Sequence, residues 1–120
     1  MDWVTIHGSV PSKSNCYRII TIAGHASLGK TKALREYERN FFLQMGRYRN
    51  AHIQGFFELE VNVYWPSLGH DLDNSLKVIL DCLQAGGAIK NDNRCVKITA
   101  QKFIDKRAPR IEFRINDLDL

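Results

Sequence analysis

The stretch that decides the fold covers residues 69–92 and reads GHDLDNSLKVILDCLQAGGAIKND. It opens with two carboxylates one residue apart, Asp71 and Asp73, continues in a helical pattern, breaks at a Gly-Gly pair and returns an acid at Asp92. Hard divalent cations such as Mg²⁺ take oxygen ligands, usually carboxylates together with water and substrate phosphates. The stretch therefore predicts a helix that carries a candidate metal site.

Apolar residues recur in this stretch at every third or fourth position, which predicts a helix with one face toward the core: Leu72, Leu76, Ile79, Leu80 and Leu83. We expect Asp73 or Asn74 as its N-cap. Asp73, Lys77 and Asp81 step by four residues and would stack an acid, a base and an acid along the opposite edge. The Gly-Gly pair ends the helix because glycine tolerates a positive φ.

The rest of the chain predicts mainly strands. A second helix is expected from Lys30 to about Gln44, and Gly55–Trp65 alternates apolar and polar residues as a half-buried strand does. The other expected strands are Trp3–Ile6, Tyr17–Ala23, Cys95–Phe103 and Ile111–Ile115, of which the last two would form an antiparallel hairpin. We predict a single α+β domain over residues 1–120, with a mixed sheet of about five strands and two main helices.

Residues 24–31 read GHASLGKT and match the phosphate-binding pattern GxxxxGK[ST] between an expected strand and an expected helix. A nucleotide hydrolase of that class needs a parallel sheet with several crossover helices, which this order of elements hardly supplies. We interpret the segment as a loop and helix start, with Ser27 or Thr31 as possible cap, and we expect no nucleotide cofactor. A P-loop nucleotide hydrolase stays open as a minor alternative.

The composition is that of a globular protein, with 44% hydrophobic and 25% charged residues. No window approaches the roughly 20 apolar residues that cross a bilayer, and the N-terminus does not resemble a signal peptide. Three cysteines far apart, without a CxxC pair, argue against a disulfide framework or a zinc site. We expect a cytoplasmic protein without a membrane partner. A net charge of +4 around an acidic motif suits a polyanion substrate handled through a metal.

The central motif resembles that of the RusA family of Holliday-junction resolvases. The family pattern D-L-D-N-x-x-K-x-x-x-D-x-L-x-x-x-G, followed by a further acid, stands here as Asp71, Leu72, Asp73, Asn74, Lys77, Asp81, Leu83, Gly87 and Asp92. The chain length and the early loop with Pro11, Ser12 and Asn15 are similar to members carried by bacteriophages and prophages.

The resemblance implies a homodimeric, Mg²⁺-dependent endonuclease, with Mn²⁺ as a possible substitute. It would bind four-way junctions in branched DNA and place paired symmetric nicks, serving recombination and repair in a bacterial host. By the resemblance, Asp71, Asp73 and Asp92 match the catalytic, metal-binding carboxylates and Lys77 the essential lysine. Two positions depart from the family: Asn91-Asp92 stands for a frequent Asp-Asp, and Arg94 stands for a frequent glutamine.

DNA contacts are expected mainly from basic and polar residues outside the acids. The candidates are Lys13, Asn15, Arg18, Asn74 and Arg94, and further surface cations could meet phosphates in any sequence: Arg47, Arg49, Lys97, Lys102 and Arg107. A solvated surface role stays open for each of them. A protein on the same scaffold that binds branched DNA without cutting it is the alternative function.

Overall fold

The strand β4, Phe57–Trp65, organises the molecule, in a computed structural model that describes residues 2–12 and 15–118. Its odd-numbered side chains are all buried, while the residues between them are half-buried. This alternation confirms the predicted half-buried strand. Because β4 has a neighbour on each side, it forms the middle of the sheet.

The main sheet has four strands in the order β1-β6-β4-β5. β1 is Val4–His7, β5 is Cys95–Ile104 and β6 is Arg110–Asp117. The predicted hairpin between the last two strands is wrong, because β5 pairs parallel with β4 and β6 pairs antiparallel with β4 on its other side. Burial explains the choice: β6 buries alternate residues completely and suits the interior, whereas β5 exposes Val96 and Ile98 at an edge.

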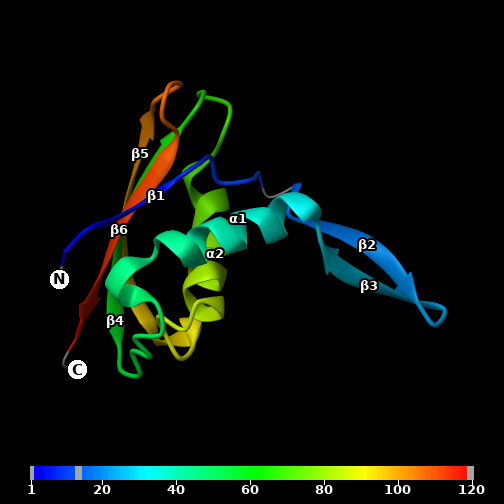
Figure 1. Cartoon of the computed structure of the whole chain (residues 1–120), viewed down its shortest axis with the longest axis horizontal. Helices are drawn as coiled ribbons and strands as arrows, with labels where there is room; N and C mark the ends of the chain where they lie inside the picture. Colours follow the sequence, from blue (N-terminus) through cyan, green and yellow to red (C-terminus); the bar gives the residue numbers. More distant parts are fainter. Residues whose placement is uncertain (1, 13–14, 119–120) are drawn as a thin grey trace.

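Two helices cover one face of this sheet (Figure 1): α1, Lys32–Gln44, and α2, Leu72–Ala85. α1 begins two residues later than expected, and the Thr31 hydroxyl caps it by accepting a hydrogen bond from the Leu34 N–H at 3.2 Å. Short 3-10 turns follow at η2, Gly46–Tyr48, and η3, Asp92–Arg94. In the described residues no helix is long and apolar enough to cross a membrane.

The buried side of α2 is centred differently from the prediction. Ser75, Val78, Ile79, Cys82 and Leu83 are buried, whereas Leu72, Leu76 and Leu80 are only partly so. The reason is that α2 packs against both the sheet and α1, so its apolar stripe is wider than one face of the helix.

The expected N-cap of α2 is also wrong. The helix starts at Leu72, and Asp71 occupies the cap position without a side-chain capping bond.

A two-stranded hairpin stands apart from the main sheet: β2, Tyr17–Ile22, pairs antiparallel with β3, His25–Lys30. The interpretation of residues 24–30 as a loop is therefore wrong. Ala23 and Gly24 form the turn with φ of 52° and 80°, and the residues of the apparent P-loop continue as an extended strand. The α+β class is confirmed, and the described residues form six strands, four in the main sheet and two in the hairpin.

Candidate active site

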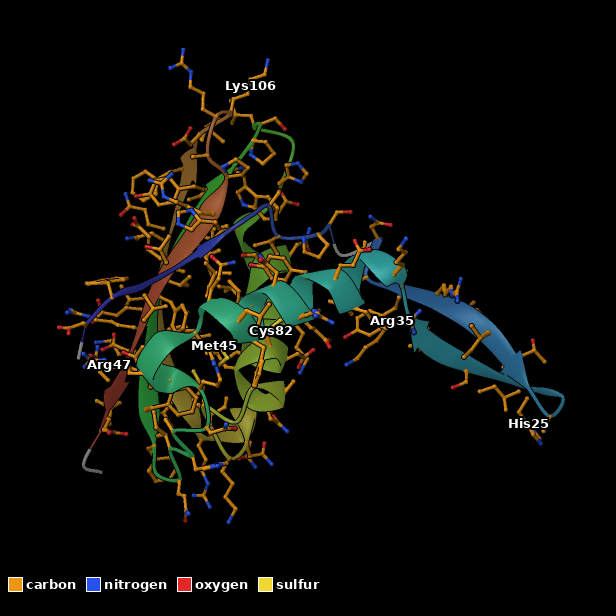
Figure 2. The ribbon with its side chains drawn as sticks, viewed as in Figure 1. His25, Arg35, Met45, Arg47, Cys82 and Lys106 are labelled. Carbon is orange, nitrogen blue, oxygen red and sulfur yellow. The ribbon has the colours of Figure 1, made fainter. Side chains whose placement is uncertain are left out.

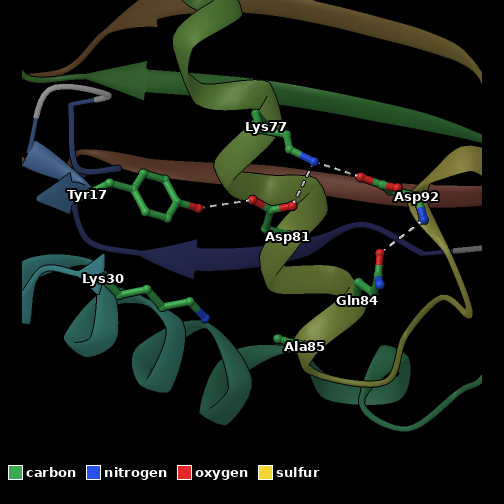
Figure 3. Close-up of a pocket in the computed structure, with 7 residues that line it drawn as sticks. All are labelled: Tyr17, Lys30, Lys77, Asp81, Gln84, Ala85 and Asp92. Atoms are coloured by element: carbon green, nitrogen blue, oxygen red, sulfur yellow. Dashed lines mark hydrogen bonds and ion pairs between the residues drawn. The ribbon is translucent and has the colours of Figure 1, made fainter. Parts of the chain in front are cut away.

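A pocket of 520 Å³ lies where the outer edge of α2 meets η3 and the root of the hairpin (Figure 3). α2 contributes Lys77, Asp81, Gln84 and Ala85, η3 contributes Asp92, and the hairpin contributes Tyr17 and Lys30. Its lining is mostly polar and charged. The pocket therefore gathers the second half of the acidic motif, including two of the predicted catalytic residues.

Lys77 joins two acids at this pocket. Its ammonium lies 2.9 Å from Asp92 Oδ2 and 3.0 Å from Asp81 Oδ1. Hydrogen bonds, first to Asp92 and then to Asp81, raise the pKa of Lys77 above its ordinary value, so the amine is a cation throughout the neutral range. Two carboxylates around one ammonium leave a net negative charge, and two of the three lysine donors are occupied.

The neighbours of this cluster hold both acids in place. The Tyr17 hydroxyl donates to Asp81 Oδ2 at 3.4 Å, and the Asp92 backbone N–H donates to Gln84 Oε1 at 3.1 Å. Burial, followed by the charge of Asp81, raises the pKa of the Tyr17 phenol, so the hydroxyl keeps its proton near neutral pH. Lys30, across the pocket, is bound to Glu38 at 2.9 Å.

The Gly-Gly pair sets the path from α2 to Asp92. Gly87 has a φ of 73°, which strains any other residue, and a Cβ on Gly86 would come within 2.3 Å of the Met45 sulfur. Beyond the pair the chain runs beside residues 50–53, where the N–H groups of Asn50 and His52 donate to the Gly86 and Gly87 carbonyls at 3.1 and 2.8 Å. This pairing fixes the segment that returns Asp92 to the side of Lys77.

Asp71 and Asp73 lie at the other end of the motif, in the first turn of α2. Both side chains are exposed, and neither forms a hydrogen bond or ion pair with another described residue. The predicted stack of Asp73 on Lys77 is not formed, because Lys77 turns toward Asp81 and Asp92. The start of α2 thus presents two carboxylates that the described chain leaves without a partner.

The donor chemistry of these residues fits a hard divalent cation. Mg²⁺ is usually held through one or two carboxylates together with water and substrate phosphates, and Asp71 and Asp73 offer such a pair. Across residues 2–12 and 15–118, however, no three His, Cys, Asp or Glu side chains lie close enough together to hold a metal ion. Asp92 is engaged by Lys77 instead, so the three-carboxylate ligand set stays a prediction.

The turn that leads into Asp71 is held from β5. The Lys102 ammonium donates to the Leu68 carbonyl at 3.2 Å and to the His70 carbonyl. The His70 ring stacks on Trp65, with ring centroids 4.5 Å apart. These contacts restrain the backbone between β4 and α2, and therefore where Asp71 begins the helix.

The candidate DNA contacts are dispersed over the surface. Asn15 and Arg18 lie at the root of the hairpin and on β2, Asn74 lies in the first turn of α2, and the Arg94 guanidinium stacks over Phe56 at 5.3 Å. Lys13 lies outside the described residues. Of the other cations, Arg47 pairs with Asp2, Lys97 with Glu58, and Arg49 donates to backbone carbonyls at the end of α1. Their role in DNA binding stays a prediction.

Sequence reasoning missed two residues around the site as functional candidates, Tyr17 and Gln84, and it considered Lys102 only as a surface cation that could meet phosphates. Asp81 was seen only as a helix-edge partner of Lys77, and that i, i+4 spacing is confirmed. Gln84 lies one helical turn after Asp81, a spacing that would have indicated the same edge. No local signal could have placed Tyr17 or Lys102 there, because each comes from a strand far away in the chain.

Comparison with known proteins agrees with the motif. A family model described as endodeoxyribonuclease RusA matches residues 17–116, a span that includes the hairpin, both helices and the whole acidic motif. No curated protein matches the chain. With a match over most of its length, the chain belongs to the RusA family of endodeoxyribonucleases.

Proposed function

We propose that this chain is a divalent-metal-dependent nuclease that resolves four-way DNA junctions by paired symmetric nicks, acting as a homodimer in recombination and repair. Membership of the family supports a nuclease that hydrolyses phosphodiester bonds in branched DNA. The observation that supports this proposal most directly is that the acidic motif is split between two places on the molecule. Two acids that have no partner within residues 2–12 and 15–118 stand at the start of α2, and the Lys77–Asp92 pair borders the pocket further along.

The proposed roles follow from what each group has available. Asp71 and Asp73, with Asp92, would hold a Mg²⁺ or Mn²⁺ ion. When bound, such an ion supplies an activated water and stabilises the leaving oxygen. Lys77 lies beside Asp92 and Asp81 as a cation, and its third N–H would be available to a phosphate oxygen. Tyr17 keeps Asp81 oriented beside Lys77.

A two-fold dimer would match the symmetry of a four-way junction, because one surface used twice addresses two opposed strands. The surface cations would contribute contacts to phosphates independent of sequence. A bacterial host cytoplasm, with phage or prophage origin, stays the expectation drawn from the sequence. The apparent P-loop segment does not favour nucleotide hydrolysis, since extended β3 does not wrap backbone N–H groups around a phosphate.

The test compares a mobile four-way junction with a linear duplex of the same sequence, in Mg²⁺ or in EDTA. Asp73→Asn is measured beside the wild type, and Glu36→Gln, which neutralises an exposed acid on α1, is the matched control. We expect paired nicks in the junction only, lost with EDTA and with Asp73→Asn while junction binding persists. Tight junction binding without cleavage in any divalent metal would establish the non-cleaving alternative instead.

A further inference from the structure

A lysine on the edge strand of the sheet holds the backbone at the entrance to α2. The Lys102 ammonium donates to the Leu68 carbonyl at 3.2 Å and to the His70 carbonyl. The second of these carbonyls belongs to the peptide group that joins His70 to Asp71. Because a peptide group is planar, a hydrogen bond that fixes this carbonyl also fixes the direction in which the chain enters Asp71.

Lys102 stands where its strand would otherwise place an apolar residue. In the parallel register of β5 with β4 it lies beside Val63, which is completely buried in the core between sheet and helices. Alternate residues of a strand share a face, so Ile98 and Ala100 precede Lys102 on this side of β5. A half-buried ammonium loses part of its hydration and needs hydrogen-bond acceptors in return. The two carbonyls of the turn are those acceptors.

The same turn is held a second time through a side chain. The His70 ring stacks on Trp65, with ring centroids 4.5 Å apart and planes 8° apart. Trp65 is itself buried, and its carbonyl accepts a hydrogen bond from the Asp105 N–H at 2.8 Å. The turn is therefore fastened to the sheet at its backbone by Lys102 and at a ring by Trp65. In the part of the chain that the structure describes, Lys102 forms no ion pair with a carboxylate that would draw it elsewhere.

The carboxylates that follow the turn have no comparable support of their own. Asp71 occupies the N-cap position of α2 without a side-chain capping bond, and Asp73 is exposed in the first turn. Metal ligands are usually oriented by groups behind them, and removal of such a group typically costs about 10- to 100-fold in metal affinity or activity. For these two acids the support comes through the backbone, and Lys102 holds that backbone at the peptide before Asp71.

We propose that Lys102 is a positioning residue for the metal site: its hydrogen bonds to the turn before α2 hold Asp71 and Asp73 in the arrangement that binds a divalent cation. The inference deepens the proposed function and rests on it, because these acids are taken as metal ligands. The charge of Lys102 acts in the opposite direction, since an ammonium repels a cation, but across water that repulsion is weak. Removal of Lys102 therefore weakens metal binding if positioning dominates and strengthens it if charge does.

The test is Mn²⁺ binding by the full chain without DNA, followed by the electron paramagnetic resonance signal of free Mn²⁺. Lys102→Met removes the hydrogen bonds, and Lys102→Arg restores a donor. Lys106→Met is the matched control, because Lys106 is exposed in the turn between β5 and β6 (Figure 2). We expect Mn²⁺ affinity to fall at least about tenfold in Lys102→Met, to recover in part in Lys102→Arg and to stay unchanged in the control. A Lys102→Met variant that binds Mn²⁺ as tightly as the wild type, or more tightly, would overturn the proposal.

Asp71→Asn, measured beside these variants, separates this inference from the proposed function. Weaker Mn²⁺ binding in Asp71→Asn but not in Lys102→Met would overturn the positioning role alone. A wild type that binds Mn²⁺ no better than Asp71→Asn would overturn the metal role of that acid and the positioning role with it.

A second variant covers the case in which Lys102→Met does not fold. Lys102→Gln keeps N–H donors on a shorter, neutral side chain. We expect it to raise the Mg²⁺ concentration at half-maximal junction cleavage by at least about fivefold, with junction binding in EDTA unchanged. A purely structural loss would lower the fraction of active protein without moving this midpoint. Weaker junction binding at an unchanged midpoint would make Lys102 a phosphate contact and overturn the proposal.

Discussion

The two ends of the acidic motif differ in what surrounds their carboxylates. At the start of α2, Asp71 and Asp73 are exposed and have no partner among the described residues. At the pocket, Asp81 and Asp92 share the ammonium of Lys77 and are about 30% exposed. Unpaired surface acids contribute little to folding, so the first pair is free to serve a ligand. The second pair is already neutralised in part and holds the site together.

The largest expected effect is a difference in cleavage rate between two variants, each of which replaces one acid at one end of the motif. Asp71→Asn should reduce junction cleavage by at least about 100-fold, because it removes a proposed metal ligand that supports several kcal/mol of charge stabilisation. Asp81→Asn should reduce it by less than about tenfold, since Lys77 keeps Asp92. Single-turnover rates on a four-way junction measure both. Equal losses in the two variants would show that the ends do not differ in function.

A smaller effect is expected from Lys77, which links the pocket acids. Lys77→Met should reduce cleavage by about 10- to 100-fold, because the donor to a phosphate oxygen and the charge beside Asp92 are both lost. Lys77→Arg keeps the charge and should recover part of the rate. The free energy of unfolding should change by less than about 1 kcal/mol, since the lysine side chain is 69% exposed. A Met variant that cuts as well as the wild type would remove Lys77 from the mechanism.

The smallest expected effect is the pH dependence of the stability that Lys77 contributes. Its folded-state pKa lies above the unfolded value, which is about 10.4 for lysine. A raised lysine pKa stabilises the folded state fully below the unfolded pKa, and the contribution is lost as the pH rises through the folded pKa. The difference in unfolding free energy between wild type and Lys77→Met should thus stay constant from pH 7 to about 10 and decline above it. Urea unfolding across that range measures it, and a decline already near neutrality would contradict the pairing.

Local sequence patterns predicted the helices and strands themselves better than they predicted which strands pair with each other. The alternation in β4 and the helix at α1 follow from local sequence patterns alone, and both are confirmed. The partner of β5 is not encoded in its own alternation, because parallel pairing with β4 depends on α2 crossing between them. The apparent P-loop was misinterpreted for a related reason: β3 is stabilised by pairing with β2, and its own sequence has no strand pattern.

The contacts of the site likewise include some that local spacing predicts and others that depend on distant parts of the chain. The Lys77–Asp81 contact follows from helical spacing and was predictable. Lys77 also meets Asp92, but that contact depends on the Gly86–Gly87 turn and its pairing with residues 50–53, which no spacing rule contains. The family motif nevertheless named both residues.

The order of strands also governs when the sheet can be completed during synthesis. β6, the last strand of the described residues, lies between β1, the first of them, and β4. Until the ribosome has made β6, β1 has no strand to pair with and one edge of β4 stays open. At about 5–20 residues per second, synthesis takes several seconds or more, during which the helix that carries the acids has only a partial sheet beneath it. An unfinished chain without β6 therefore lacks the complete sheet that supports α2 and its acids.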